Sequence, residues 1–193
     1  MNKITLAVIL ILAFSSCWRC DDPIVIDRGK IPDSILSYVP YQNGLNYKFR
    51  HSGGLVIGFS AVRASNEAWQ ECHRCCKFAY KYEENVTTLI PDYPIFNIGF
   101  NLANRDSLFF DFGVWIGRDG FSIPANDYQA GFAGFADSVM IGEKPYFNVF
   151  KIKSYYSSGH PRDTLFTDSI YYSYQHGLIL IKMSNGEKYT IYE

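Results

Sequence analysis

The strongest constraint on the fold is the regular spacing of short apolar and aromatic runs between turn signals. The clearest case comes last in the chain, where Gly177 to Met183 and Glu187 to Tyr192 flank Ser184-Asn185-Gly186. Asn-Gly between two apolar runs favours a tight β-hairpin, because both turn residues tolerate positive φ angles. Phe, Trp and Tyr make up 17% of the residues, and these side chains favour strands. The pattern predicts antiparallel β-structure.

Eight further runs of the same kind precede this hairpin. Asn43-Gly44 is a turn signal before the first of them, and Ser52-Gly53-Gly54 is another between the first and the second. Asp119-Gly120 is a later reversal signal. The expected strands are Leu45 to Phe49, Leu55 to Val62, Cys76 to Glu84, Val86 to Ile90, Phe96 to Leu102, Leu108 to Trp115, Val139 to Ile141 and Tyr146 to Lys153.

Two stretches depart from this pattern. Ser65 to Cys75 places Ala68, Trp69 and Cys72 at the spacing of one helical face, which predicts a short helix or helical turn. Ile123 to Ala136 is rich in Gly and Phe, and it predicts a long irregular loop. About ten strands with at most one short helix predict an all-β fold, either an antiparallel β-sandwich or a β-barrel.

The N-terminus reads MNKITLAVILILAFSSCWRCDD. Lys3 is followed by the apolar run Ile4 to Phe14 and then by small residues before Cys17, which is the composition of a secretory signal. A membrane-spanning helix needs about 20 apolar residues. The run is too short for that, so we expect a signal peptide.

Phe14-Ser15-Ser16-Cys17 resembles the lipobox of bacterial lipoproteins, with Phe14 where Leu is usual. The resemblance implies a signal peptide at 1–16 and a lipidated Cys17 as the first mature residue. The second mature residue would be Trp18 and not the aspartate that retains many such proteins in the inner membrane. This implies the outer membrane, with the lipid anchor making the membrane a partner. Ordinary cleavage and free secretion is the alternative.

The rest of the chain divides into a tether and a domain. Residues 17–33 contain Pro23, Gly29 and Pro32 and are expected to be a lipidated tether, followed by a single β-rich domain at 34–193. That domain resembles uncharacterised small lipoproteins that end in a similar hairpin, a likeness that implies no function.

Charge and motifs exclude several functions. Lys and Arg number 18 against 19 Asp and Glu, without blocks of one sign, so no nucleic-acid partner is expected. The four histidines are scattered, and no HExxH or GxSxG motif occurs. We therefore assign no catalytic residue, metal site or cofactor.

The cysteines other than Cys17 are Cys20, Cys72, Cys75 and Cys76. Outside the cytoplasm a disulfide among these four is the main expectation, and buried free thiols are the next. A metal site or a redox pair is also conceivable, but a metal site normally needs a second ligand pair.

Five triplets read Asp–Ser/Thr–apolar, which is more than this composition predicts. They resemble the acceptor triplet of an O-glycosylation system for exported bacterial proteins. The acceptors would be Ser34, Ser107, Ser138, Thr164 and Ser169. The alternative is structural, since Asp and Ser close turns before an apolar residue begins a strand.

These observations favour a non-catalytic binding or structural module of the cell envelope. Carbohydrate is a possible ligand, because aromatic rings stack on sugar faces, and an envelope protein is another possible partner. The aromatic platform would consist of Trp115, Tyr128, Phe132 and Phe135, although ordinary core packing also explains these rings. Two other functions stay open: a hydrolase of envelope or extracellular polymers, and an accessory lipoprotein for membrane assembly or transport.

Overall fold

A computed structural model describes residues 23–70, 78–105, 110–125, 134–155 and 165–192. The predicted all-β class is confirmed, because the described chain contains strands and one helix of four residues. The elements are β1 (Ile24–Asp27), α2 (Asp33–Leu36), β2 (Asn46–His51), β3 (Val56–Gln70), β4 (Phe78–Pro91), β5 (Ile98–Ala103), β6 (Asp111–Ile116), β7 (Asp119–Ser122), β8 (Phe135–Ile141), β9 (Lys144–Lys153), β10 (Thr167–Ser173), β11 (Gly177–Met183) and β12 (Lys188–Ile191).

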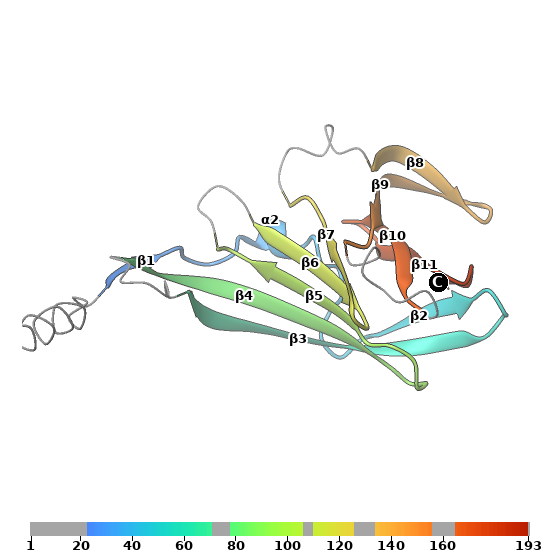
Figure 1. Cartoon of the computed structure of the whole chain (residues 1–193), viewed down its shortest axis with the longest axis horizontal. Helices are drawn as coiled ribbons and strands as arrows, with labels where there is room; N and C mark the ends of the chain where they lie inside the picture. The colour runs from blue at the N-terminus through green and yellow to red at the C-terminus, as the bar shows by residue number, and fades with distance from the viewer. Residues whose placement is uncertain (1–22, 71–77, 106–109, 126–133, 156–164, 193) are drawn as a thin grey trace, which may run out of the picture.

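Eleven of these strands form one antiparallel sheet in the order β7-β6-β5-β4-β3-β2-β12-β11-β10-β9-β8. Most neighbours in the sheet are also neighbours in sequence, and the β2–β12 pair joins the two halves. The sheet curls into a half-barrel (Figure 1), which lies between the sandwich and the barrel predicted from the sequence.

Aromatic side chains fill the concave side of the half-barrel. Phe112 on β6 and Tyr172 on β10 are both buried, and their ring centroids lie 5.4 Å apart at an interplanar angle of 84°. Phe100 on β5 reaches the same tyrosine, with a centroid distance of 6.2 Å. Edge-to-face contacts of this kind add to the free energy gained by burial. A smaller apolar cluster joins the β8–β9 hairpin to β10 and β11 through Tyr146, Val149, Tyr171, Ile179 and Leu180.

The β3–β4 hairpin extends beyond the half-barrel, and we call this extension the stalk (Figure 1). Antiparallel pairing continues from Phe59 and Pro91 out to Gln70 and Tyr80. At the far end β1 adds a parallel pair, with Ile24 opposite Phe78. Within the described residues, no helix is long and apolar enough to cross a membrane.

The helix predicted for Ser65 to Cys75 is wrong for the part that is described. Residues 65–70 continue β3, and each pairs with a residue of β4. Helical spacing was present, but the long ladder of cross-strand hydrogen bonds outweighs it. The expected break between Cys76–Glu84 and Val86–Ile90 is also wrong, because Asn85 is buried within one continuous strand.

Three boundaries also differ from the prediction. The tether was expected to reach residue 33, but β1 belongs to the sheet and Ile31 is buried in the core. The reversal expected at Asp119-Gly120 occurs at Gly117-Arg118, where Gly117 has a φ of 62°. Phe135 begins β8, where the sequence indicated an irregular loop.

Candidate binding site on the convex face

Strand β6 places one tryptophan on the convex face of the half-barrel. Phe112, Val114 and Ile116 alternate into the core, so Gly113 and Trp115 point outward. The six-membered ring of Trp115 lies over Gly113, where an added Cβ would collide with it. The indole therefore uses the space that the missing side chain of Gly113 leaves, and 37% of the residue stays exposed.

Glycines surround this tryptophan on both neighbouring strands. Trp115 pairs with Gly99 on β5 and with Gly120 on β7. The space above Gly99 is open, with no atom within 4 Å of a Cβ built there. Gly120 is covered by the phenol of Tyr155, which follows β9 and is itself 51% exposed. Two exposed aromatic side chains thus border a surface with few other side chains.

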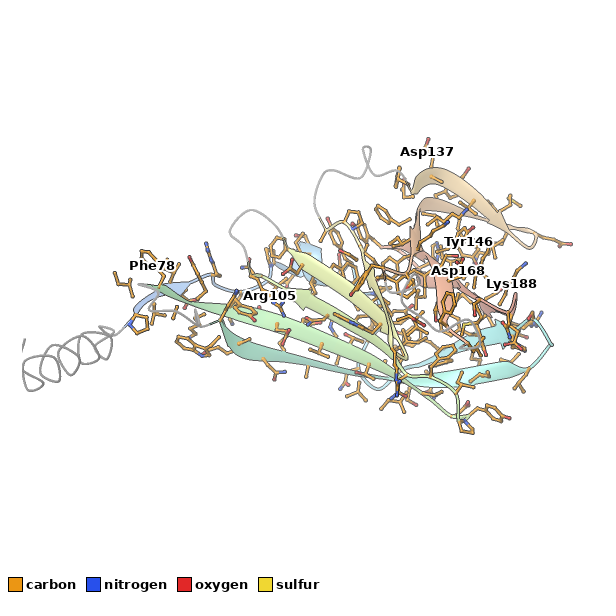
Figure 2. All side chains as sticks on the ribbon, in the orientation of Figure 1. Phe78, Arg105, Asp137, Tyr146, Asp168 and Lys188 are labelled. Atoms are coloured by element: carbon orange, nitrogen blue, oxygen red, sulfur yellow. The ribbon has the colours of Figure 1, made fainter. Side chains whose placement is uncertain are left out.

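Polar groups lie next to the tryptophan along the sheet. Asn101 on β5 pairs with Gly113, and its amide nitrogen donates to Glu84 Oε1 at 2.6 Å. Arg105 Nη2 lies 3.4 Å from the same oxygen, and its Nε lies 3.9 Å from Asp111 Oδ2. Figure 2 shows Arg105 where β5 meets the stalk. An amide, two carboxylates and a guanidinium therefore lie together beyond Gly113.

We call this surface the convex patch. It consists of Glu84, Asn101, Arg105, Asp111, Trp115 and Tyr155. The side chains of Arg105 and Asp111 are 45% and 63% exposed, so their ion pair contributes little to stability. These groups can exchange partners with a ligand at low cost. The arrangement combines a flat apolar surface with donors and acceptors at its edge.

Of the convex patch, only Trp115 was predicted from the sequence. Phe135 is partly buried and packs on Phe150, with ring centroids 5.3 Å apart, so it does not join Trp115. Tyr128 and Phe132 lie outside the described residues. Tyr155 was not predicted, because it follows β9 and reaches β7 only through the curl of the sheet. Its N–H donates to the carbonyl of Gly120 at 3.3 Å.

The lipidation and disulfide candidates lie outside the described residues. These are Cys17, Cys20, Cys72, Cys75 and Cys76. Ile24 at the start of β1 pairs with Phe78 at the start of β4, so these two strands begin at the same end of the sheet. Among the described residues, no three His, Cys, Asp or Glu side chains are grouped so that they could hold a metal ion.

The proposed glycosylation sites differ in accessibility. Ser34 in α2 and Ser138 in β8 are exposed. Ser169 in β10 is only 2% exposed, so glycosylation there would require this strand to open. Ser107 and Thr164 lie outside the described residues.

A separate pocket of about 490 Å³ opens at the edge of the core. Its lining is mainly apolar and includes Ile95, Phe96, Ile116, Leu165, Met183 and Tyr189. Arg118, Asp119 and Thr167 also line it. Asp119 Oδ2 accepts the Thr167 N–H at 2.6 Å, and the Thr167 hydroxyl donates to Met183 Sδ at 3.7 Å. The pocket suits a small apolar molecule better than a polymer.

Comparisons of the chain with protein-family models, with curated proteins and with solved structures found no match. The function therefore has to be argued from the geometry of this chain.

Proposed function

We propose that the protein is an outer-membrane lipoprotein, anchored through Cys17, that acts as a non-catalytic binding module with the convex patch as a carbohydrate site. The observation that carries the carbohydrate assignment is the indole of Trp115, whose six-membered ring lies close to Gly113 and which stays 37% exposed on the convex face. A sugar ring has an apolar face that stacks on such an indole and hydroxyls that need hydrogen-bonding partners at its rim.

The polar side of the patch supplies those partners. Glu84 and Asp111 offer acceptors, and Arg105 and Asn101 offer donors. Glu84, Asn101 and Asp111 project from paired strands, and their contacts position Arg105, which follows β5 by two residues. Rigid strands hold a binding site more precisely than loops do.

The position of the patch also favours binding over hydrolysis. A glycosidase places two carboxyl groups about 5 to 9.5 Å apart across the scissile bond of its substrate. Here both carboxylates, Glu84 and Asp111, pair with the guanidinium of Arg105 on a convex surface instead of facing each other across a bound substrate. A hydrolase role stays a prediction, and the convex patch does not supply a catalytic site for it.

The stalk supports display away from the membrane. Thr88 pairs with Gly99, which is next to Trp115 in the sheet. Thr88 lies ten positions along β4 from Phe78 at the stalk end. At about 3.3 Å per residue this is roughly 33 Å. A lipid anchor joined to the stalk end would hold the patch beyond the headgroup layer, where polymers can reach it.

Affinity gel electrophoresis of the mature chain tests the assignment, with gels containing laminarin, xylan, dextran, pectin or hydroxyethylcellulose. We expect one of these to retard the protein and Trp115→Ala to weaken that binding by about tenfold, which corresponds to about 1.4 kcal/mol. Trp115→Phe should retain part of the affinity. The matched control is Trp69→Ala, which removes an even more exposed tryptophan from the stalk. Retardation that survives Trp115→Ala unchanged would overturn the assignment.

The anchor needs its own test. Intact mass of the protein extracted from membranes should show a chain that begins at Cys17 and carries acyl groups. Cys17→Ala should leave an unlipidated chain. A mature chain recovered without lipid from the soluble fraction of wild-type cells would contradict the anchor.

The apolar pocket favours a second candidate, an accessory role in carrying a small apolar molecule. Ile116→Trp should fill the pocket and abolish binding of a probe such as 1-anilinonaphthalene-8-sulfonate, while Trp115→Ala should leave it unchanged. Probe binding that is insensitive to Ile116→Trp would remove this candidate.

A further inference from the structure

The end of the stalk carries four large apolar side chains that the sheet leaves exposed. Ile24 is 61% exposed, Val25 50%, Trp69 51% and Phe78 42%. They lie on three adjacent strands, because β4 pairs with β1 on one side and with β3 on the other. We call these four residues the apolar end.

The apolar end is apolar on both faces of the sheet. Ile24 pairs with Phe78, so these two side chains share one face. Val25 pairs with Ala79, and Trp69 pairs with Lys81. Ala79 and Lys81 are two residues apart on β4 and therefore share a face. Val25 and Trp69 thus lie together on the opposite face from Ile24 and Phe78. Figure 1 shows β1 and the end of β4 far from the half-barrel. Ala79 is buried beside Val25, but a single layer of strands this far from the core leaves the four larger side chains exposed.

Charged groups lie level with Trp69, behind Ile24, Val25 and Phe78, because Lys81 pairs with both Trp69 and Asp27. Lys81 Nζ lies 2.7 Å from Glu67 Oε2 and 4.0 Å from Asp27 Oδ2. The hydrogen bond that Lys81 donates to the Glu67 carboxylate raises the pKa of Lys81, which keeps the ammonium charged. On the other face, the Arg28 guanidinium lies 4.6 Å from the ring centroid of Tyr80. Lys81 lies three positions after Phe78 on β4, which is about 10 Å along the strand. Interfacial segments bury apolar side chains about 5 to 10 Å deep.

The chain that leaves the apolar end leads to the lipidation candidate. Six residues, 18–23, lie between Cys17 and Ile24. Even when fully extended, these seven steps span at most about 25 Å. A lipid on Cys17 would therefore keep the apolar end within about 25 Å of the bilayer.

We propose that the apolar end inserts into the interface of the bilayer that holds the Cys17 lipid, and that this second contact orients the stalk. The proposal rests on the proposed lipid anchor and adds a protein surface to it. One lipid attachment would let the domain swing, whereas an attachment plus an inserted strand end fixes which way the convex patch faces.

Tryptophan fluorescence of the lipidated protein tests this contact. One variant, Trp18→Phe with Trp115→Phe, reports Trp69 alone, and its match, Trp18→Phe with Trp69→Phe, reports Trp115 alone. Both are reconstituted into vesicles of phosphatidylethanolamine and phosphatidylglycerol with brominated acyl chains. Since the quencher acts at the depth of an interfacial segment, Trp69 should lose about half or more of its emission and Trp115 should lose none. Replacing Ile24 and Phe78 with Ser should reduce the quenching of Trp69, with an unchanged far-ultraviolet spectrum.

The intact mass of the same samples tests the Cys17 anchor separately from the membrane contact of the apolar end. A lipidated, vesicle-bound protein in which Trp69 is quenched no more than Trp115 would overturn the apolar end as a membrane contact and leave the anchor standing. A mass without lipid would overturn the anchor, and the proposed orientation would fall with it.

Discussion

Arg63 joins β3 to β4 and to the segment that ends α2 through one partly buried guanidinium. Its Nε donates to Asn85 Oδ1 at 2.9 Å, Nη1 to the Val39 carbonyl at 3.0 Å and Nη2 to the Leu36 carbonyl at 2.9 Å. Burial lowers the pKa of Arg63, but a guanidinium stays protonated in proteins. One planar group therefore satisfies three acceptors from two segments of the chain, β4 and residues 36–39.

Arg63→Lys should cost about 2 to 3 kcal/mol of the free energy of unfolding, because an ammonium cannot reach three acceptors arranged in a plane. Urea unfolding measures this change. The control is Arg50→Lys, since Arg50 lies over the exposed ring of Tyr192 and should change stability by less than about 0.5 kcal/mol. Equal stability of the two variants would contradict the role given to Arg63.

Burial raises the pKa values of Tyr41 and Tyr172 above the ordinary tyrosine value. Above about pH 10 the unfolded chain loses these protons while the folded chain keeps them, so the folded state binds more protons and stability falls as pH rises. The two groups together predict a slope of up to about 2.7 kcal/mol per pH unit.

Unfolding by urea between pH 9 and 11 checks this slope. Tyr41→Phe should make it shallower, and at pH 7 should cost about 1 to 3 kcal/mol because the hydroxyl accepts the buried Leu178 N–H at 2.7 Å. Tyr93→Phe, at an exposed position, should change neither value. A stability that stays constant up to pH 11 would be inconsistent with two buried phenols.

At the scale of elements, the start of β11 depends on a glycine. Gly177 has a φ of 73°, and a Cβ at this position would collide with the hydroxyl of Tyr41. Gly177→Ala should therefore cost about 3 kcal/mol or more, through strain and a steric clash. Gly186→Ala is the matched control, because Gly186 also has a positive φ but faces open space, and it should cost about 1 to 2 kcal/mol. Thermal unfolding that ranks the two variants equally would refute the clash.

The elements also show what the sequence could predict. The final hairpin was predicted within one residue, since Asn185-Gly186 fixes both its turn and its register. Strand β10 was missed because nearly every residue from Thr167 to Ser173 is buried, which removes the alternation that marks a half-exposed strand. Trp115 was found as an aromatic residue at a strand end. Its polar neighbours on β4 and β5 could not be found, because only the pairing register brings them together.

At the scale of the whole molecule, stability should be distributed unevenly. The half-barrel contains the large apolar core, whereas β3 residues 64–70 in the stalk are exposed or only partly buried. Regions with few buried apolar contacts open at low free energy. Hydrogen exchange should therefore show weaker protection for the amides of Glu67 to Gln70 than for those of β11. Equal protection would mean that the stalk unfolds only together with the core.

The central claim is that a polysaccharide stacks on the exposed face of Trp115. The most direct measurement is a fluorescence titration of the Trp18→Phe, Trp69→Phe protein, in which Trp115 is the sole tryptophan, with the polysaccharide that retards the wild-type chain. We predict a saturable shift of the emission with the same affinity as the gel retardation. Saturable binding with an unchanged Trp115 emission would place the ligand elsewhere and contradict the account.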